Sequence, residues 1–427
     1  MIREDGVRAD SPVAQLIVAS LRVDADGQAV ESARAACGDV DWARFFRSAD
    51  GHGVTPLIAH RWQSLDRMEH VPDFARERLL SALRHNAERN AHIRREAVDY
   101  WRLLTEAGVP AIVLKGWPLV EMLYESPALR HLSDIDLLIP ADRSREGLRA
   151  LEAAGLEPLP RNREAWVEKH LPAYWRLRGR RVTYPLSDLF DPNHPRSVEL
   201  HLHVWETNFR GLRLRDPIGF WERSRLADVA GWPMRLPSLE DTLIHLCVHW
   251  ACHWIEREAR LSQLVDVDRF VRKFAGRLDW NLILRVSRAA QVTRFVYAAL
   301  ETAHRVLGAP LPPEEFTAQS RAGCPPRLRH WMDRYAAEDA LAMDSGRRDH
   351  GMAYVLTWLS AQSVGERVGM LRYALLPPRE FIMGRYGLKR RWLAIPFYLP
   401  YIAGRTLNTM GPFARAVTRF ARLGSQA

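Results

Sequence analysis

Two aspartates one residue apart, Asp134 and Asp136, lie on an apolar stretch that ends before Pro140. The apolar residues and the closing proline predict a β-strand over residues 134–139. Because successive strand side chains point to opposite faces, the two carboxylates share one face of this strand. Two carboxylates held side by side repel each other, so we expect a cation between them. Their oxygens suit Mg²⁺, which shares its remaining positions with water and phosphate oxygens.

The segment before this strand contains elements that would bring a phosphate to it. A short apolar strand is predicted over residues 111–114, and it stops at Lys115 and Gly116. A helix is predicted over residues 118–125, with proline at its first position, where the missing N–H does no harm. Gly116 lets a phosphate approach the backbone, and the N–H groups that open the helix point toward an anion.

A third strand is predicted over residues 197–204, where polar and apolar residues alternate. Glu199, His201 and His203 face one side of this strand, and its apolar residues face the other. The alternation places a carboxylate and two imidazoles on one surface of the same sheet.

The order strand, glycine, short helix and Asp-x-Asp strand resembles the nucleotidyltransferases related to DNA polymerase β. More narrowly, residues 114–139, LKGWPLVEMLYESPALRHLSDIDLLI, resemble an uncharacterised bacterial nucleotidyltransferase family. Members of that family often lie in biosynthetic clusters for lasso peptides and surface polysaccharides. Three further runs share the resemblance: HGVTPLIAHR, PSLEDTLIHLCVHWACHW and RYALLPPREFIMGRY.

The resemblance implies an α+β fold, with a polymerase-β-like nucleotidyltransferase core embedded in a mostly helical chain. It implies transfer of an NMP group from an NTP, with ATP as the expected one, aided by Mg²⁺ or Mn²⁺. Asp134 and Asp136 would hold the metal ions, and a third carboxylate from a neighbouring strand would complete the site. Glu199 is the candidate for it, although a salt-bridged strand glutamate would show the same pattern. His201 would be a metal neighbour or an acceptor contact.

The residues around the triphosphate depart from the superfamily in one position. Serine usually follows the helix-opening glycine, here Gly116, but this chain has Trp117. The change removes a hydroxyl contact to phosphate. Lys115 and Arg130 are candidate replacements, as cations near the phosphates or as plain surface charges. Ser133 would contact phosphate or cap the turn before the strand.

Three histidines, His245, His249 and His253, recur every four residues on a predicted helix that starts after Ser238. Their spacing and the nearby Cys247 suggest zinc. The sequence lacks the glutamate of the metalloprotease motif, and Cys247 points to a different face from His249. A core or cleft-facing helix is therefore the favoured interpretation, with His249 and His253 lining the nucleotide or acceptor cleft.

Bulk composition is that of an ordinary globular protein, with 47% hydrophobic and 26% charged residues among 427. Four scattered cysteines form no disulfide framework, and the first residues lack a signal-peptide core, which predicts a cytoplasmic protein. Of the net charge of +10, eight positive charges fall after residue 380, where no acidic residue occurs. A nucleic-acid-binding surface is not indicated.

The basic tail leads to one prediction about partners. Residues 392–403 are apolar, interrupted by two prolines, and too short to cross a bilayer, which needs about 20 residues. Flanking basic residues would allow peripheral contact with the inner face of a membrane. Packing of this segment on the helical part of the protein is the favoured alternative.

Four regions are predicted along the chain. They are an N-terminal helical region (1–105), a nucleotidyltransferase α/β core (106–230), a helical domain that closes the cleft (231–315) and a C-terminal helical region with a basic tail (316–427). The leading hypothesis is a metal-dependent transferase acting on a small molecule, peptide or protein in a biosynthetic pathway. The alternatives are an inactive nucleotide-binding scaffold and a membrane-associated accessory protein.

Overall fold

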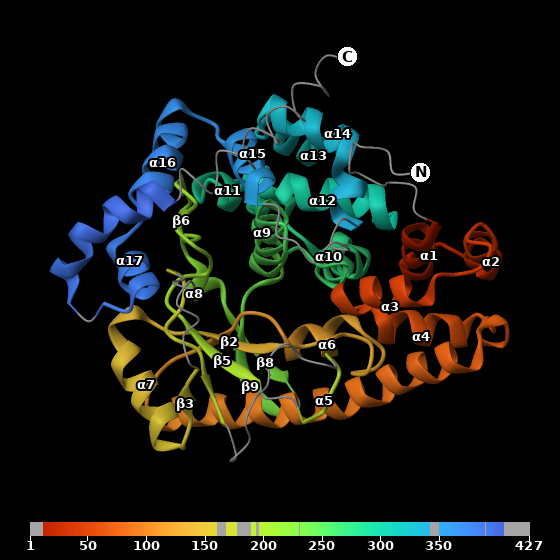
Figure 1. Cartoon of the computed structure of the whole chain (residues 1–427). Coiled ribbons are helices and arrows are strands. Elements are labelled where there is room, and N and C mark those ends of the chain that lie inside the picture. The colour runs from red at the N-terminus through yellow and green to blue at the C-terminus, as the bar shows by residue number, and fades with distance from the viewer. Residues whose placement is uncertain are drawn as a thin grey trace.

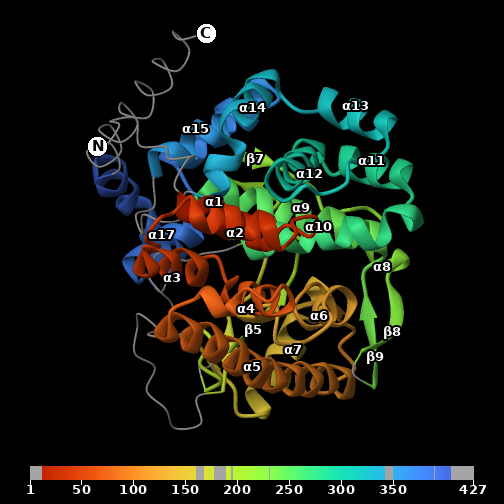
Figure 2. The same cartoon turned by 90° about the vertical axis from the view of Figure 1, so that its right-hand side faces the viewer.

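The structure, a computed structural model, describes residues 12–159, 168–176, 189–193, 196–229, 231–341, 350–388 and 390–404, with the backbone alone for 334–341 and 350. Two layers of helices enclose a small sheet. In Figure 1 and Figure 2, the long helix α5 underlies the sheet, and the helices from α9 onward form the opposite layer. The sequence also predicts a strand-like run over residues 181–186, RVTYPL, and this run lies outside the described residues.

The N-terminal region is helical, as predicted. Its elements are α1 (Pro12–Leu21), α2 (Gly27–Ala35), α3 (Trp42–Gly51), α4 (Thr55–Ser64), the 3-10 turn η1 (Met68–His70) and α5 (Asp73–Glu106). Pro72 holds the cap position of α5, and Asp73 is the first helical residue, paired with Arg76. Pro72 has an extended backbone, with a φ of −52° and a ψ of 145°. An extended residue of this kind normally precedes the first helical residue.

The five-stranded sheet has the order β1-β2-β5-β4-β3. Its strands are β1 (Ile112–Val113), β2 (Asp134–Leu138), β3 (Glu157–Pro158), β4 (Tyr174–Trp175) and β5 (Ser197–His201). Strands β2 and β5 are parallel, and the other pairs are antiparallel. The third predicted strand ends at His201 and not at residue 204. The chain turns away there, and the backbone N–H of Val204 donates a hydrogen bond to the Asp216 carboxylate instead of to a neighbouring strand.

The connection between β2 and β5 includes the 3-10 turn η2 (Ala141–Arg143) and α7 (Ser144–Ala153). Helix α7 approaches the sheet closely at Gly147, where an added Cβ would lie 2.9 Å from the Ile139 side chain. The helix ends before Gly155, which has a φ of +78° and donates its N–H to the Glu152 carbonyl.

The two faces of the sheet pack against different cores. Ile135 and Leu137 of β2 join the core that contains the second half of α5, whereas Leu138 joins the core of the opposite helices. Asp134 and Asp136 alternate with Ile135 and Leu137, so their side chains face the layer that contains α9. Helix α5 contributes to both cores, which ties the N-terminal region to the sheet.

The helical layer follows two small hairpins. The hairpin elements are β6 (Asn208–Phe209), β7 (Leu212–Arg213), β8 (Arg225–Val229) and β9 (Trp232–Leu236), with α8 (Phe220–Arg223) between them. The layer itself contains α9 (Leu239–Glu256), α10 (Leu261–Phe274), η3 (Ala275–Arg277), α11 (Trp280–Ala289), α12 (Thr293–Leu307), α13 (Glu314–Ala322), α14 (Pro326–Leu341) and α15 (His350–Ser360). The predicted cap of α9 is confirmed, because Ser238 accepts a hydrogen bond from the Asp241 N–H at 3.0 Å.

The chain continues at the outer edge of the molecule in α16 (Val364–Leu375), α17 (Arg379–Tyr386) and the 3-10 turn η5 (Arg391–Leu393), which leads into helical residues 394–404 (Figure 1). A separate small core of Ile382, Ala394 and Tyr401 joins α17 to residues 394–404. Among the described residues, no helix is both long enough and apolar enough to cross a membrane.

A buried ion pair connects the loop before β2 to the helical layer. Asp266 of α10 binds the Arg130 guanidinium at 2.7 Å and accepts a hydrogen bond from the Tyr124 hydroxyl at 2.7 Å. The Asp266 side chain is 1% exposed. Removing one member of such a pair leaves the other charge buried without compensation.

We therefore expect Asp266→Ala to lower the free energy of unfolding by about 3–5 kcal/mol. Asp333→Ala is the matched control, since Asp333 pairs with Arg305 at the surface and should cost less than about 1 kcal/mol. Urea denaturation followed by circular dichroism measures both changes. Equal small losses in the two variants would contradict a structural role for the buried pair.

Candidate functional site

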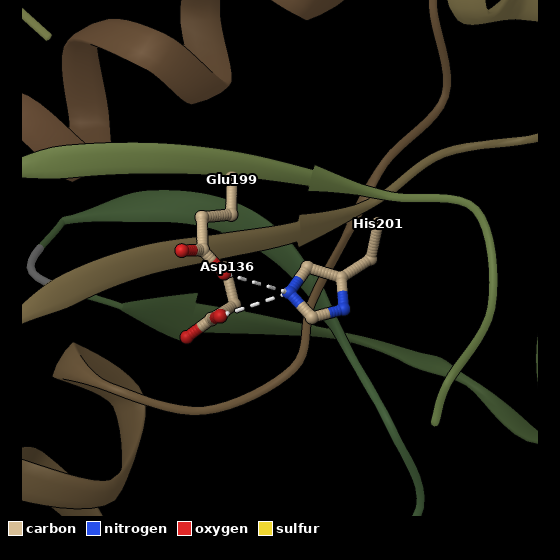
Figure 3. Close-up of side chains that lie close together, drawn as sticks. All are labelled: Asp136, Glu199 and His201. Atoms are coloured by element: carbon tan, nitrogen blue, oxygen red, sulfur yellow. Dashed lines mark hydrogen bonds and ion pairs between the residues drawn. The ribbon is translucent and has the colours of Figure 1, made fainter. Parts of the chain in front are cut away.

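The parallel pairing of β2 and β5 brings two carboxylates together. In the register of the two strands, Asp136 lies opposite Glu199, and Leu138 lies opposite His201. Glu199 and His201 are two residues apart on β5, so both side chains project from the same face as Asp136. Figure 3 shows the three side chains converging between the two strands.

His201 lies between the two carboxylates. Its Nε2 is 2.9 Å from Asp136 Oδ1 and 3.6 Å from Glu199 Oε2, and its side chain is 1% exposed. A nitrogen that faces two carboxylates must carry the proton. Burial lowers the pKa of His201, but the hydrogen bond to Asp136 and the nearby Glu199 carboxylate outweigh burial and leave the pKa above its ordinary value.

Lys115 supplies the cation between the paired aspartates. Its Nζ is 2.6 Å from Asp136 Oδ2 and 3.3 Å from Asp134 Oδ1. Burial disfavours the charged form of Lys115, but the two aspartates outweigh it and raise its pKa. Burial likewise disfavours the Asp136 anion, yet Lys115 and His201 hold the pKa of Asp136 well below its ordinary value. Asp136 and Lys115 are therefore both charged at neutral pH.

Asp134 lies at the outer end of this cluster. Its side chain is 29% exposed, against 2% for Asp136, and it accepts a hydrogen bond from the Ser133 hydroxyl at 2.9 Å. The Glu199 side chain, 19% exposed, is the other accessible carboxylate. Burial raises the pKa of Glu199, but its hydrogen bond with His201 and the charge of His170 bring the net pKa below its ordinary value.

The glycine and the short helix lie beside the cluster, in the order predicted. Gly116 has a φ of +84°, a conformation that glycine adopts readily and other residues rarely do. Helix α6 spans Trp117–Leu123, one residue earlier at its start than predicted. The Trp117 side chain is buried in the core beneath the sheet, and its indole N–H donates to Glu121 at 2.6 Å. Trp117 therefore has a packing role in this structure.

Arg130, a candidate phosphate contact, is held by protein groups in this structure. Its Nε and Nη2 bind the Asp266 carboxylate, and its Nη1 lies 3.5 Å from the His131 carbonyl oxygen. Burial opposes the charge of Arg130, but Asp266 outweighs it and raises the pKa. Lys115 and Ser133 touch the aspartate pair directly, whereas Arg130 anchors the loop before it.

The three histidines of α9 lie close enough to Lys115 for its charge to lower the pKa of each. The ring centroids of His245 and His249 are 6.0 Å apart, and those of His249 and His253 are 4.6 Å apart. Burial, followed by the charge of Lys115, lowers the pKa of His245 to about 3. Burial also lowers the pKa of His253 to about 3. These imidazoles are therefore neutral at physiological pH.

The zinc interpretation gains no support from the side-chain positions. Within the described part of the chain, the groups with metal-ligand spacing are Asp136 with Glu199 and His201, and His253 with Glu256 and Glu258. Neither group includes a cysteine. Cys247 is fully buried, and desolvation alone raises the pKa of its thiol well above the ordinary value, so it stays a thiol.

Two further histidines at the site were not predicted from the sequence. The backbone of His170 forms an isolated antiparallel β-bridge with His201 of β5, and the His170 Nε2 is 3.5 Å from Glu199 Oε2. His245 has no hydrogen-bond partner on either ring nitrogen among the described residues. Its place in the same four-residue series as His249 and His253 was a signal for it, whereas nothing in the basic, aromatic segment around His170 distinguished that residue.

The chemistry of the cluster fits a divalent metal ion. Asp136, Glu199 and His201 each place a carboxylate oxygen or ring nitrogen within 4.8 Å of the others. The two carboxylates would bind the ion, because His201 Nε2 carries a proton toward them. Asp136 Oδ2 is buried and paired with the Lys115 ammonium at 2.6 Å. Three carboxylates against one lysine and one histidine leave a net negative charge, which favours a hard cation. Lys115 would have to move if that cation bound Asp136 Oδ2.

Comparison with known proteins assigns the chain to a family. A family model described as an uncharacterised nucleotidyltransferase matches residues 38–308. The match covers more than half of the chain, so the chain belongs to this family. The matched range contains β2, β5 and α9, and therefore every residue of the cluster. No curated protein and no solved structure matches the chain.

The raised pKa of His201 predicts a pH-dependent contribution to stability. This contribution is complete below the ordinary histidine pKa of about 6.5 and is lost as the pH rises through the folded-state pKa. The difference in unfolding free energy between the wild type and His201→Asn should therefore shrink above pH 6.5. The expected loss is about 1.4 kcal/mol for each unit by which the folded-state pKa is raised.

Urea denaturation without divalent metal, at intervals from pH 6 to pH 9, measures this difference. A difference that stays constant or grows with pH would contradict a protonated His201 between the carboxylates.

Proposed function

We propose that the chain transfers an NMP group from an NTP to an acceptor at the Asp134, Asp136 and Glu199 cluster. The observation that carries this proposal is the register of β2 with β5, which sets Asp136 opposite Glu199 beside the Gly116 helix start. Membership in a nucleotidyltransferase family supports the reaction class. The order of glycine, helix and Asp-x-Asp strand supports the finer assignment to the polymerase-β-like superfamily.

The residues of the cluster have separable roles in this proposal. Asp136, Glu199 and Asp134 would hold Mg²⁺ or Mn²⁺, with the buried His201 proton keeping Asp136 and Glu199 in place. When bound, a divalent ion stabilises the negative charge that builds on the α-phosphate and the leaving group. Lys115 lies next to Gly116, so its ammonium would turn from Asp136 to the triphosphate as the ion enters.

The reaction forms one bond and breaks one bond. An acceptor oxygen or nitrogen attacks the α-phosphorus, the bond from that phosphorus to the bridging oxygen breaks, and pyrophosphate leaves. The acceptor proton passes to a carboxylate at the opening of the site. Glu199 suits this role, because it is ionised and partly exposed. The imidazoles of α9 are neutral, so they would donate or accept hydrogen bonds with the substrates without adding charge.

A second candidate function is nucleotide binding without turnover, in a scaffold for a biosynthetic partner. The buried Trp117 favours it, because the helix start lacks the hydroxyl that would contact phosphate. The two functions differ in one observable product. Turnover releases pyrophosphate, whereas a scaffold retains the intact NTP.

We expect Asp136→Asn and Glu199→Gln to reduce label transfer from an α-³²P-labelled NTP with Mg²⁺ or Mn²⁺ by at least about 100-fold. Each substitution keeps the size of the side chain and removes the charge that would hold the metal. Asp142→Asn is the matched control, since Asp142 is exposed in η2 just after the Asp-x-Asp strand. Each NTP is tested in turn, together with candidate acceptors and pyrophosphate detection.

Metal-dependent pyrophosphate release that both variants lose supports catalysis. Saturable NTP binding by the wild type without any release supports the scaffold instead. Release that persists undiminished in Asp136→Asn would place the reaction elsewhere in the chain.

Lys115→Gln should strengthen Mn²⁺ binding and weaken NTP binding. The substitution removes the ammonium that lies 2.6 Å from Asp136, so an incoming ion meets an uncompensated carboxylate pair. We expect Mn²⁺ affinity to rise by about tenfold, which corresponds to roughly 1.4 kcal/mol. Electron paramagnetic resonance of free Mn²⁺ during a titration measures the affinity, and Lys273→Gln, on the surface of α10, is the control. Unchanged Mn²⁺ affinity would show that lysine and metal do not compete.

A further inference from the structure

Helix α16 exposes an apolar stripe to solvent. Val364, Val368, Leu371 and Leu375 are spaced at intervals of four, three and four residues, which places them on one helical face. They are between 46% and 71% exposed. An amphipathic helix of a globular protein normally turns such a face toward the core. In α16 the buried positions are instead Glu366 and Met370.

The last described helical segment repeats this feature. Trp392, Ile395 and Leu399 are spaced at intervals of three and four residues, and each is more than half exposed. The Tyr398 hydroxyl donates to the Pro377 carbonyl oxygen at 2.7 Å, which fixes this segment to the end of α16. Eight of the fifteen large apolar side chains that are exposed in the described chain lie between residues 364 and 399. Such a concentration marks an interaction surface.

The same region is basic. The described arginines between residues 364 and 404 are Arg367, Arg372, Arg379, Arg385, Arg390 and Arg391. Its acidic residues are Glu366, which pairs with the buried Arg294, and Glu380, which pairs with Arg391. The surface therefore presents an excess of positive charge beside its apolar stripes.

A cavity opens next to these stripes. It has a volume of about 600 Å³ and lies between the β6–β7 hairpin and helices α16 and α17. Arg213, Arg372 and Arg379 line it, and none of the three side chains has a hydrogen bond or ion pair with another described residue. Leu376 is 53% exposed and lines the cavity, so the basic cavity and the apolar surface adjoin.

Two glycines bring the walls of this cavity together. A Cβ on Gly211 of the hairpin would lie 2.5 Å from the Gly369 carbonyl oxygen, and one on Gly369 would lie 2.6 Å from the Gly211 carbonyl oxygen. Only glycine at both positions permits this backbone contact between the hairpin and α16. The cavity is thus a fixed part of the fold.

We propose that α16, α17 and residues 390–404 form a docking surface for an anionic lipid bilayer, with a lipid phosphate held in the arginine cavity. Apolar stripes on helices too short to span a bilayer suit insertion into its interfacial region, and the flanking arginines match lipid phosphates. The sequence placed such contact in the tail after residue 380. Helix α16, which precedes that tail, supplies half of the apolar surface.

Co-sedimentation of the full-length protein with vesicles tests the proposal. We expect binding to vesicles of phosphatidylcholine with one quarter phosphatidylglycerol, weaker binding to pure phosphatidylcholine, and loss of binding at high salt. The double variant Val368→Glu/Leu371→Glu should bind roughly tenfold more weakly or worse. Ile218→Glu is the matched control, because Ile218 is 79% exposed outside this surface, and its variant should bind like the wild type.

The arginines have a separate test. Arg213→Gln/Arg372→Gln/Arg379→Gln should weaken binding to the anionic vesicles by about tenfold or more and reduce the preference for phosphatidylglycerol. All of these variants keep residues 405–427. Any loss of vesicle binding is therefore due to the substituted residues of the described surface. Circular dichroism melting curves confirm that each variant is folded.

Failure of the wild type to bind anionic vesicles, or equal binding by the Val368→Glu/Leu371→Glu variant, would overturn the proposal. Equal binding by the triple arginine variant would contradict the proposal that the cavity holds a lipid phosphate. A wild type that stays off vesicles but self-associates, with the double variant monomeric in light scattering, would instead assign the surface to contact between copies of the chain. None of these outcomes depends on nucleotidyl transfer.

Discussion

Charge compensation between two parallel strands is the constraint on which the rest of the structure depends. The pairing of β2 with β5 sets Asp136 opposite Glu199. Together with Asp134, these residues place three carboxylates on one face of a sheet that helices cover. Burial alone would raise the pKa values of Asp136 and Glu199. Lys115 and the protonated His201 prevent this, so the cluster remains anionic. A buried anionic cluster that is only partly neutralised suits the metal binding that we propose.

The surrounding helices maintain this arrangement from two sides. Asp266 of α10 holds Arg130, and with it the loop that leads into β2. Helix α9 covers the carboxylate face, and burial keeps its histidines neutral. These histidines therefore add no positive charge near Lys115. The family match includes both helices and ends just after α12, whereas the basic, apolar surface of α16 and α17 lies beyond it. The proposed nucleotidyl transfer and the proposed membrane contact thus belong to different parts of the chain.

Local patterns in the sequence were sufficient for much of the site. Alternation along residues 134–138 and 197–201 predicted which side chains share a face, and the two cores confirm the apolar faces. Strand partners were not predictable, because register depends on contacts between distant segments. The sequence therefore could not show that Lys115 lies between the aspartates, that Asp266 holds Arg130 or that His170 reaches Glu199. It also could not show that the stripe on α16 faces solvent, since the same spacing usually marks a buried face.

The position of a bound metal ion tests the central claim most directly. Crystals grown with Mn²⁺ and a non-hydrolysable NTP analogue would locate the ion by its anomalous scattering. We predict a manganese peak about 2.1 Å from carboxylate oxygens of Asp136 and Glu199, with the Lys115 ammonium moved from Asp136 to the phosphates. A manganese ion bound elsewhere, with Lys115 still 2.6 Å from Asp136 Oδ2, would contradict the account.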